Sequence, residues 1–498
     1  MSYAVRFIDD IPCERRPRQE EVSVMLDRFV FRRDGGVKRL PENKTMAGSS
    51  TCTGAPFRVS LGLFAPPSTS RFYLEWPGGP NEDTGIPCHL VAAHRNCVLF
   101  RLTSIVRSKT RPQYLIYPDD YYLYRPATAD LKRLPTCTRT KPVAAEGEQK
   151  QDKLGLMSKS EPSDSEPWEW DSSESDSGEI VMTEEMKWAE KASREHYEEK
   201  LAMGVDVDHD VVRSSLVMER IGLLCQESSE GGDEFVVTEL QLVTLNRKVS
   251  AELSLLRSSA SDWVHMPLPI HCNNKRDSAA LRHFCIQAVV PLSDCLCWVD
   301  YCSGIIIAKN VLDKTPSLSY IPLPHTPPSG CEHQLRSVCA TVGGHLLKFI
   351  DTVVDQQPCS SGFTIISYIL IATEEGSMEW KKETSMTSDE MWGLKAPGRV
   401  PHEVPMFPLV NLENPDIIHF QLSECTDYVD TVTLLTIDMS ARSVVSVFTH
   451  IKGEQELRGE DADVAEARTG LLQPFLLAMV PKFLLVRPVN LRKRKDQS

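Results

Sequence analysis

Cysteine, histidine and aspartate side chains gather at a few places in the sequence where they could bind a metal ion or move a proton. The densest group is CHLVAAHRNC, with Cys88, His89, His94 and Cys97. A zinc site needs paired ligands whose spacing lets a short loop wrap the ion. Here Cys88 and His89 are adjacent in an apolar run that alternates like a β-strand, so they would point to opposite faces. We therefore expect strand core and no structural zinc.

Two further groups lie near the middle of the chain. Cys295 and Cys297, in LCWVDYCSG, are two residues apart and would share one strand face as small buried side chains. Asp300 and Asp351 follow apolar runs, where a carboxylate could serve as a general base. Because neither aspartate has a catalytic partner at a fixed spacing, we predict that both form turns.

Known catalytic and cofactor motifs are missing from the sequence. It contains no GxxxxGK[ST], GxGxxG, GxSxG or HExxH pattern, so we expect no cofactor. Trp263, Trp298, Trp380 and Trp392 could form a binding platform, but aromatic side chains in strands more often pack in the core. We therefore predict packing roles for these four residues.

The composition limits the kinds of partner. The chain has 498 residues, of which 41% are hydrophobic and 25% charged, and its net charge is −14. These proportions are typical of a globular protein with enough apolar residues for a core. The negative charge disfavours electrostatic binding to nucleic acid, and no direct nucleic-acid contact is expected.

Cysteine use and the first residues indicate a reducing compartment. The 15 cysteines include no CxxC pair, and MSYAVRFIDDIPCERR has no apolar segment of the kind found in secretory signals. We expect free thiols, no disulfide, and a cytoplasmic or nuclear location. The apolar stretch LLQPFLLAMVPKFLLV, residues 471–486, contains two prolines and Lys482 and is shorter than the roughly 20 residues of a membrane span. It predicts buried core and no membrane partner.

One block of the chain differs sharply in composition. EPSDSEPWEWDSSESDSGE, residues 161–179, holds eight acids and no base, which predicts disorder because so little apolar area can be buried. EEMKWAEKASREHYEEKLAMG, residues 184–204, is rich in helix-forming residues and predicts a solvated helix. The predicted organisation is an N-terminal β part at 1–145, this acidic insertion at 146–205, a C-terminal β part at 206–490 and a basic tail at 491–498.

The insertion and the tail contain the candidate regulatory residues. Ser163 and Ser173 each precede an acid by three residues, the pattern that an acid-directed kinase phosphorylates. Trp168 and Trp170 are candidate apolar anchors for a partner protein. The alternative is an inert solubilising spacer. The tail LRKRKDQS is either a nuclear-import signal or a solvated end.

Outside the insertion, the chain repeats a strand, a polar turn and a second strand. Four such hairpins lie at residues 121–135, 252–269, 304–324 and 432–448. Three end in Leu-Pro, which suits an edge strand, where a missing backbone donor costs little. A similar strand opens at Phe363. With it included and residues 146–200 set aside, the spacing is 50 to 76 residues, which favours a mainly β, propeller-like array of four-stranded antiparallel sheets with few short helices. Each hairpin would form the outer two strands of a blade. An irregular pair of β-sandwiches is the alternative.

A family resemblance rests on several of these stretches. WVDYCSGIIIAKNVLDKTPSLSYIPLP, residues 298–324, resembles the signature core of the plant domain-of-unknown-function family numbered 1618, which is expanded in grasses, and we place that core at about 298–424. The resemblance implies no known activity, substrate or catalytic residue. YRPATADLKRLP is also similar to repeats of plant F-box-associated and kelch-like propellers. The other matching stretches are VMLDRFVFRRDG, APFRVSLGLFAPPSTSRFYLEWPGGP, VAAHRNCVLFRLTS, RSVCATVGGHLLKFIDTV and EVPMFPLVNLENPDIIHFQLSE.

These observations predict a non-enzymatic scaffold that binds other proteins. One alternative is a hydrolase-type enzyme that uses loop carboxylates at the mouth of a propeller channel. Another is a ubiquitin-linked adaptor without an evident F-box. Acidic, histidine or arginine side chains that converge in one deep pocket would favour the enzyme, whereas a shallow, aromatic-rimmed face would favour binding.

Overall fold

The computed structural model divides the chain into two compact units, residues 138–214 and the remainder. In the smaller unit, β11 (Thr138–Thr140) pairs antiparallel with β12 (Val211–Arg213). The predicted disordered segment and solvated helix within 146–205, and the basic tail, lie outside the described residues. The structure describes residues 21–34, 39–80, 88–107, 115–140, 211–213, 216–227, 233–245, 248–313, 315–325, 333–342, 344–355, 362–373, 377–424, 431–452 and 474–486.

The larger unit consists of strands that are short apolar runs ended by residues that turn the chain. Between β28 (Thr431–Asp438) and β29 (Ser443–Lys452), Asp438 Oδ1 accepts the backbone N–H groups of Ser440 at 3.0 Å and Ala441 at 2.7 Å. These bonds hold a tight turn in which Arg442 has a φ of 48°. The polar turn predicted within the hairpin at residues 432–448 is therefore confirmed.

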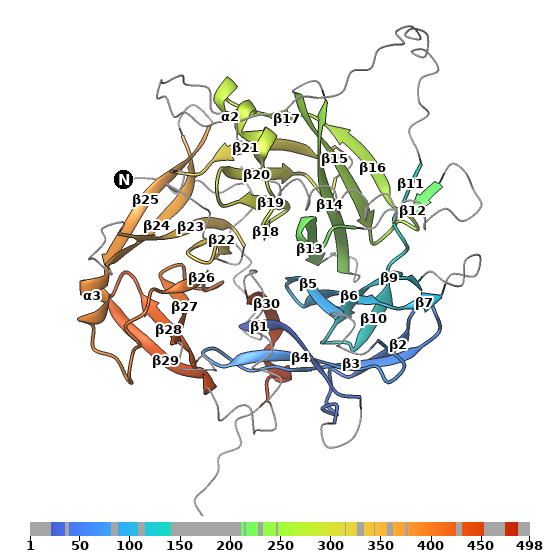
Figure 1. Cartoon of the computed structure of the whole chain (residues 1–498), viewed down its shortest axis with the longest axis horizontal. Coiled ribbons are helices and arrows are strands. Elements are labelled where there is room, and N and C mark those ends of the chain that lie inside the picture. Colours follow the sequence, from blue (N-terminus) through green and yellow to red (C-terminus); the bar gives the residue numbers. More distant parts are fainter. Residues whose placement is uncertain are drawn as a thin grey trace, which may run out of the picture. The chain divides into compact units, whose positions relative to one another are not determined.

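Six sheets of four or five strands form the larger unit, and we number them as blades in chain order (Figure 1). Blade 1 holds β1 (Glu21–Arg32), β2 (Ala47–Ser50), β3 (Pro56–Gly62), β4 (Thr69–Glu75) and β30 (Phe475–Pro481). Blade 2 holds β5 (Cys88–His94), β6 (Cys97–Thr103), β9 (Asp119–Arg125) and β10 (Asp130–Arg133), and β7 (Val106–Arg107) pairs with β8 (Leu115–Ile116) beside it in the chain. Blade 3 holds β13 (Ile221–Glu227), β14 (Asp233–Leu245), β15 (Lys248–Arg257) and β16 (Val264–Leu268).

The second half of the ring has the same plan. Blade 4 holds β17 (Ile270–His271), β18 (Ala288–Leu292), β19 (Cys295–Asp300), β20 (Gly304–Lys309) and β21 (Ser317–Pro322). Blade 5 holds β22 (Arg336–Thr341), β23 (Leu346–Val354), β24 (Phe363–Ala372) and β25 (Met378–Thr387). Blade 6 holds β26 (Met406–Val410), β27 (Ile417–Glu424), β28 and β29. The short helices are η2 (Met218–Arg220), α2 (Lys275–Ala280), η3 (Leu281–His283), α3 (Ser388–Trp392) and η6 (Lys482–Leu484).

Blade 1 closes the ring because it contains strands from both ends of the described chain. β1 pairs antiparallel with β30, with Glu21 opposite Pro481 and Asp27 opposite Phe475, and it also pairs in parallel with β4. Met25 and Phe475 belong to the same buried cluster as Phe420 of blade 6. The ring is therefore held shut by strand pairing and by packing against the last blade.

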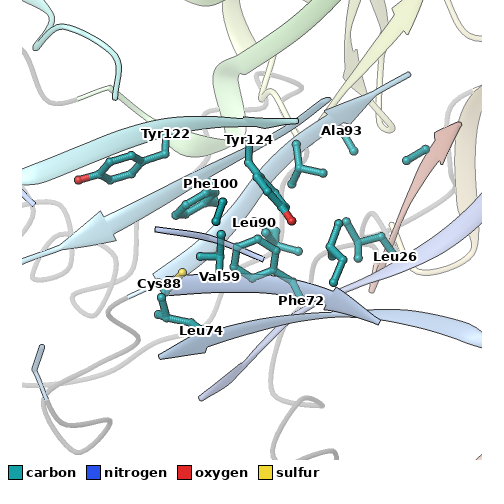
Figure 2. Close-up of a cluster of buried hydrophobic side chains, with 14 of the residues drawn as sticks. Leu26, Val59, Phe72, Leu74, Cys88, Leu90, Ala93, Phe100, Tyr122 and Tyr124 are labelled. Atoms are coloured by element: carbon teal, nitrogen blue, oxygen red, sulfur yellow. The ribbon is translucent and has the colours of Figure 1, made fainter. Parts of the chain in front are cut away.

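The core lies between neighbouring blades. The cluster between blades 1 and 2 is rich in aromatic rings (Figure 2). Phe100 stacks on Tyr122 with ring centres 5.3 Å apart and contacts Phe72 at 5.0 Å. The Tyr122 hydroxyl donates to the carbonyl of Ser50 at 2.9 Å, so its polar end is satisfied. Burying each such ring stabilises the fold by roughly 1.5–3 kcal/mol, and similar clusters join the other blades.

The predicted fold class is confirmed: the protein is mainly β, with six propeller-like sheets. The predicted hairpins form the outer two strands of blades 2, 3 and 6. In blade 4 the edge-strand prediction is wrong, because the two-residue strand β17 pairs in parallel outside β21, with Ile270 opposite Leu318. The core prediction for 471–486 is confirmed within β30, where Phe475, Ala478 and Val480 are buried, but Phe483 and Val486 beyond this strand are exposed.

Candidate functional site

A channel of about 1120 Å³ lies within the larger unit and is lined by all six blades. One edge strand of every sheet contributes to the lining: β30, β5, β13, β18, β22 and β26. Further lining residues come from β1 and β4 of blade 1 and from β27, β28 and β29 of blade 6. Each of the six edge strands contributes apolar side chains to the channel. We call this part the shaft and define it by one residue from each blade: Ala92, Leu223, Val290, Ala340, Leu409 and Leu477.

Polar side chains gather where these strands begin. Hydrogen bonds place several of these beginnings together: the Phe407 backbone N–H donates to the Gln334 carbonyl at 2.6 Å, and the side-chain Nη1 of Arg336 donates to the Tyr301 carbonyl at 2.7 Å. The shaft residues come later in each strand and so lie deeper. We call the polar end the mouth and define it by Arg28, His89, Glu219, Gln287, His333 and Arg336.

An irregularity in β1 directs Arg28 into the channel. From Leu26 to Val30, β1 advances by four residues, whereas the paired strand β4 advances by only two, from Ser70 to Phe72. Such a bulge bends the strand and re-aims side chains. The Arg28 N–H still donates to the Pro474 carbonyl at 2.9 Å, so the backbone is anchored while the side chain lines the channel.

The neighbouring Asp27 turns the other way, toward blade 6. Its Oδ1 accepts the backbone N–H of Phe29 at 3.0 Å, and its Oδ2 lies 3.6 Å from Nε2 of the buried His450. Asp27 is itself only 4% exposed. This carboxylate therefore already has partners and does not neutralise Arg28.

The Arg28 side chain has no hydrogen bond or close ion pair among the described residues. Its Nε is buried without a partner. Burial lowers the pKa of the guanidinium to about 10, although electrostatic interactions with Tyr301 and Glu219 oppose this shift. Those two residues belong to blades 4 and 3, so the guanidinium extends toward the far side of the ring. At neutral pH it is a protonated, partly desolvated cation.

Two other arginines that line the channel, Arg32 and Arg336, are paired. Arg336 forms two parallel bonds to Asp351, at 3.1 Å and 2.9 Å. Arg32 lies 2.6 Å from Asp34 and donates to the carbonyls of Trp76 and Pro80. Arg28 therefore stands apart from both as a cation that still has donors to offer.

Hydrogen bonds from neighbouring groups determine which ring nitrogen is the acceptor in two histidines of the channel, His333 and His94. Gln287 Oε1 accepts the Tyr301 N–H at 2.7 Å, so its amide nitrogen donates to His333 Nδ1 at 3.0 Å. In the neutral ring of His333, the proton is then on Nε2, which is a donor. His94 Nδ1 accepts the Cys225 N–H at 2.9 Å, and burial lowers its pKa to about 3. His94 is therefore neutral at physiological pH and a weak base.

The arrangement that most nearly resembles a hydrolase centre is buried. His450 lies 3.6 Å from Asp27 on one side and 3.4 Å from Thr69 Oγ1 on the other. Thr69 is 5% exposed and does not line the channel. A substrate in the channel would not reach this hydroxyl, so the trio packs blade 1 against blade 6. In chemical terms, the mouth is best suited to binding an anion.

The structure decides several sequence predictions about single residues. Cys88 is confirmed as strand core, and Cys295 and Cys297 share one buried cluster. Asp300 is confirmed as a turn residue: it accepts the N–H of Cys302 at 2.8 Å and the Ser303 hydroxyl at 2.8 Å. Across the residues that the structure describes, no three His, Cys, Asp or Glu side chains are grouped to hold a metal ion.

The turn prediction for Asp351 is wrong. Asp351 lies within β23, opposite Arg336 of β22, and it also accepts from His325 Nε2 at 2.7 Å. Because these two partners offset its desolvation, the strand continues through a buried carboxylate. Desolvation nevertheless raises the pKa of Asp351, against the opposing effects of Arg336 and His325.

The four tryptophans are confirmed as packing residues. Trp263, Trp298, Trp380 and Trp392 each contact a different buried cluster, so they form no common platform. Trp392 also stacks on His402 with ring centres 4.8 Å apart. The remaining candidates, Ser163, Ser173, Trp168 and Trp170, lie outside the described residues, and their roles stay predictions.

Six small sheets around a lined channel define a propeller-like fold. Within it, the family model described as "Protein of unknown function (DUF1618)" matches residues 298–419, which confirms the family predicted from the sequence. The matched segment runs from β19 to β27 and contributes Tyr301, His333 and Arg336 to the channel. No curated protein matches the chain. None of the helices among the described residues is long and apolar enough to cross a membrane.

Sequence reasoning did not single out Arg28. It lies in VMLDRFVFRRDG, where a charged residue in a strand is normally placed on the solvent face. The available signal was the pair Asp27-Arg28 inside an otherwise apolar run. Only the closed ring and the bulge show that one of these side chains lines a channel.

Proposed function

We propose that the protein is a non-enzymatic interaction scaffold whose partner proteins dock at the mouth of the channel. The partner supplies a carboxylate, from an acidic side chain or a chain terminus, that pairs with Arg28. The observation that carries this proposal is the Arg28 guanidinium, which lines the channel without a hydrogen bond or close ion pair among the described residues.

The energetics support an anion at this position. A guanidinium offers five donors in a planar fork that fits a carboxylate at two points. Hydrogen bonds to charged groups contribute roughly 1.5–3 kcal/mol each, more than neutral ones. Arg28 is already partly desolvated, which is why its pKa is lowered to about 10. Folding has therefore already removed much of the water around this cation. An incoming carboxylate has less desolvation free energy of Arg28 to offset, so the net free energy of the contact is more favourable.

The hydrolase remains a second candidate because of one observation. Arg28, Glu219 and His333 converge in a deep channel rather than on a shallow face. Glu219 is exposed, so it could act on a bound substrate as a base. Binding is preferred because Thr69, whose hydroxyl contacts the His450 imidazole that Asp27 holds on its other side, does not line the channel. The ubiquitin-linked adaptor rests only on the resemblance of residues 124–135.

Affinity capture with quantitative mass spectrometry tests the proposal. Three baits are compared: the wild type, Arg28→Gln, and Arg58→Gln as the matched control, since Arg58 is an exposed arginine paired with Glu75. The proposal predicts proteins that wild type and Arg58→Gln retain and Arg28→Gln loses. A photo-crosslinker placed at Met218, which lines the channel, should attach to the same proteins. Equal capture by all three baits would overturn the proposal.

A further inference from the structure

The channel is larger and more apolar than a single acidic side chain requires. Its volume is about 1120 Å³, whereas pockets for small organic ligands measure roughly 300–1,000 Å³. Such pockets are mostly apolar with a few well-placed polar groups. The shaft and the mouth match this description, since every blade contributes an aliphatic side chain below a ring of polar ones.

We propose that the channel binds a small amphipathic monoanion, with its apolar body in the shaft and its anionic head on Arg28. An alkyl or aryl carboxylate is the chemical class that fits. This inference goes beyond the proposed docking of a partner protein and does not depend on it, although both use Arg28. A ligand in the shaft would compete with a partner for that guanidinium.

The charges at the mouth favour one negative charge over two. Arg28 supplies a cation with a buried, unpartnered Nε, and the Nε2–H of His333 is a second donor at the same end. Glu219 lies close enough to Arg28 to affect it electrostatically, so it would repel a second charge on the ligand head. Arg336 is already neutralised by Asp351 and adds no free cation.

The apolar lining of the shaft predicts how the affinity for the ligand depends on the length of its apolar body. Ala92, Leu223, Val290, Ala340, Leu409 and Leu477 surround the channel with hydrocarbon from six directions. Each methylene transferred from water into such a setting should tighten binding about three- to fourfold. Tight binding should therefore need both the anionic head and the apolar body. A short acid lacks the burial of an apolar body in the shaft, and an alcohol lacks the ion pair with Arg28.

Isothermal titration calorimetry with three probes separates these contributions. Decanoate carries head and body, butyrate carries the head alone, and decanol carries the body alone. The proteins titrated are wild type, Arg28→Gln, Arg28→Lys and Val290→Phe. The larger side chain of Val290→Phe fills the shaft. Val445→Phe is the control for added bulk, because Val445 is 52% exposed on the outer strand β29. Thermal unfolding of each variant confirms that it is folded.

We expect wild type and Val445→Phe to bind one decanoate and to bind butyrate and decanol at least about tenfold more weakly. Arg28→Gln should bind decanoate no better than decanol, Arg28→Lys should be intermediate, and Val290→Phe should lose decanoate. The inference is overturned if decanoate does not bind wild type, or if folded Arg28→Gln binds it equally well. If decanoate fails while Arg28→Gln still loses captured proteins, the proposed function stands and only this inference falls.

Discussion

Arg336 and Asp351 face each other across β22 and β23 and form a two-point ion pair, with Nε–Oδ1 at 3.1 Å and Nη2–Oδ2 at 2.9 Å. Both side chains are almost fully buried, at 5% and 1–2% exposed. The same ring holds Arg28, which has no such partner among the described residues. Arg336 is thus neutralised within the fold, whereas Arg28 can still pair with an anionic ligand.

Removing the charge of Asp351 should destabilise the protein strongly. Asp351→Asn leaves Arg336 buried without its counter-charge, so we expect the free energy of unfolding to fall by about 3–5 kcal/mol. Urea denaturation measures this change. The control is Glu424→Gln, whose partner Arg399 is 80% exposed, and it should cost less than about 1 kcal/mol. Equal effects of the two variants would contradict the structural role given to this pair.

Closure of the ring should depend on Phe475 of β30. Phe475 is 5% exposed and packs with blade 6, so Phe475→Ala should cost about 3–5 kcal/mol of unfolding free energy. Phe483, eight residues later, is 61% exposed, and Phe483→Ala should change stability by less than about 0.5 kcal/mol. Thermal and urea unfolding check both values. If the exposed substitution were the more costly one, β30 would not be the closing strand.

The glycine at position 304 is needed because there is no room for a side chain. A Cβ there would lie 2.6 Å from the Ile321 carbonyl oxygen and 2.7 Å from the Tyr320 ring. Gly304→Ala should therefore cost about 1–3 kcal/mol through overpacking. Gly48 is also in a strand, but its Cβ would meet atoms only at 3.4 Å and beyond, so Gly48→Ala is the tolerated counterpart. Comparable melting temperatures for both variants would refute this packing.

Stability should fall in mild acid because of His94. Burial lowers its pKa from 6.5 to about 3 in the folded protein, while the unfolded chain takes up the proton near pH 6.5. Its contribution is therefore complete above pH 6.5 and declines as the pH drops toward 3. At pH 5 the loss from this one residue is roughly 2 kcal/mol.

Urea denaturation at pH 7 and pH 5 measures this dependence. His94→Gln removes the titrating group and can still accept the Cys225 N–H, so its stability should change less between the two pH values than that of wild type. His271→Gln, at an exposed position of β17, should keep the wild-type dependence. A wild-type loss that His94→Gln leaves unchanged would assign the effect to other groups.

The repeated hairpins made the propeller-like fold predictable, because each blade places a short strand, a turn and a second strand close together in sequence. Ring closure could not be predicted in the same way. Pairing of Glu21 with Pro481 joins residues at opposite ends of the chain and leaves no local pattern. Asp351 was misplaced for a related reason: its partner Arg336 belongs to the neighbouring strand, and nothing in the sequence marks them as a pair. Arg28 needed both the bulge and the closed ring to become visible as a channel residue.

Competitive labelling with phenylglyoxal, followed by peptide mapping, tests most directly whether Arg28 is an unpaired guanidinium that is open to the channel. This reagent modifies the neutral guanidine, so a pKa lowered to about 10 and the lack of a close ion pair should both accelerate its reaction with Arg28. Arg336 is the internal reference, since it is 5% exposed and bound at two points by Asp351. We predict that Arg28 is modified at least about tenfold faster than Arg336, because a pKa lowered by one unit raises the neutral fraction tenfold. Equal or slower modification of Arg28 would contradict the account.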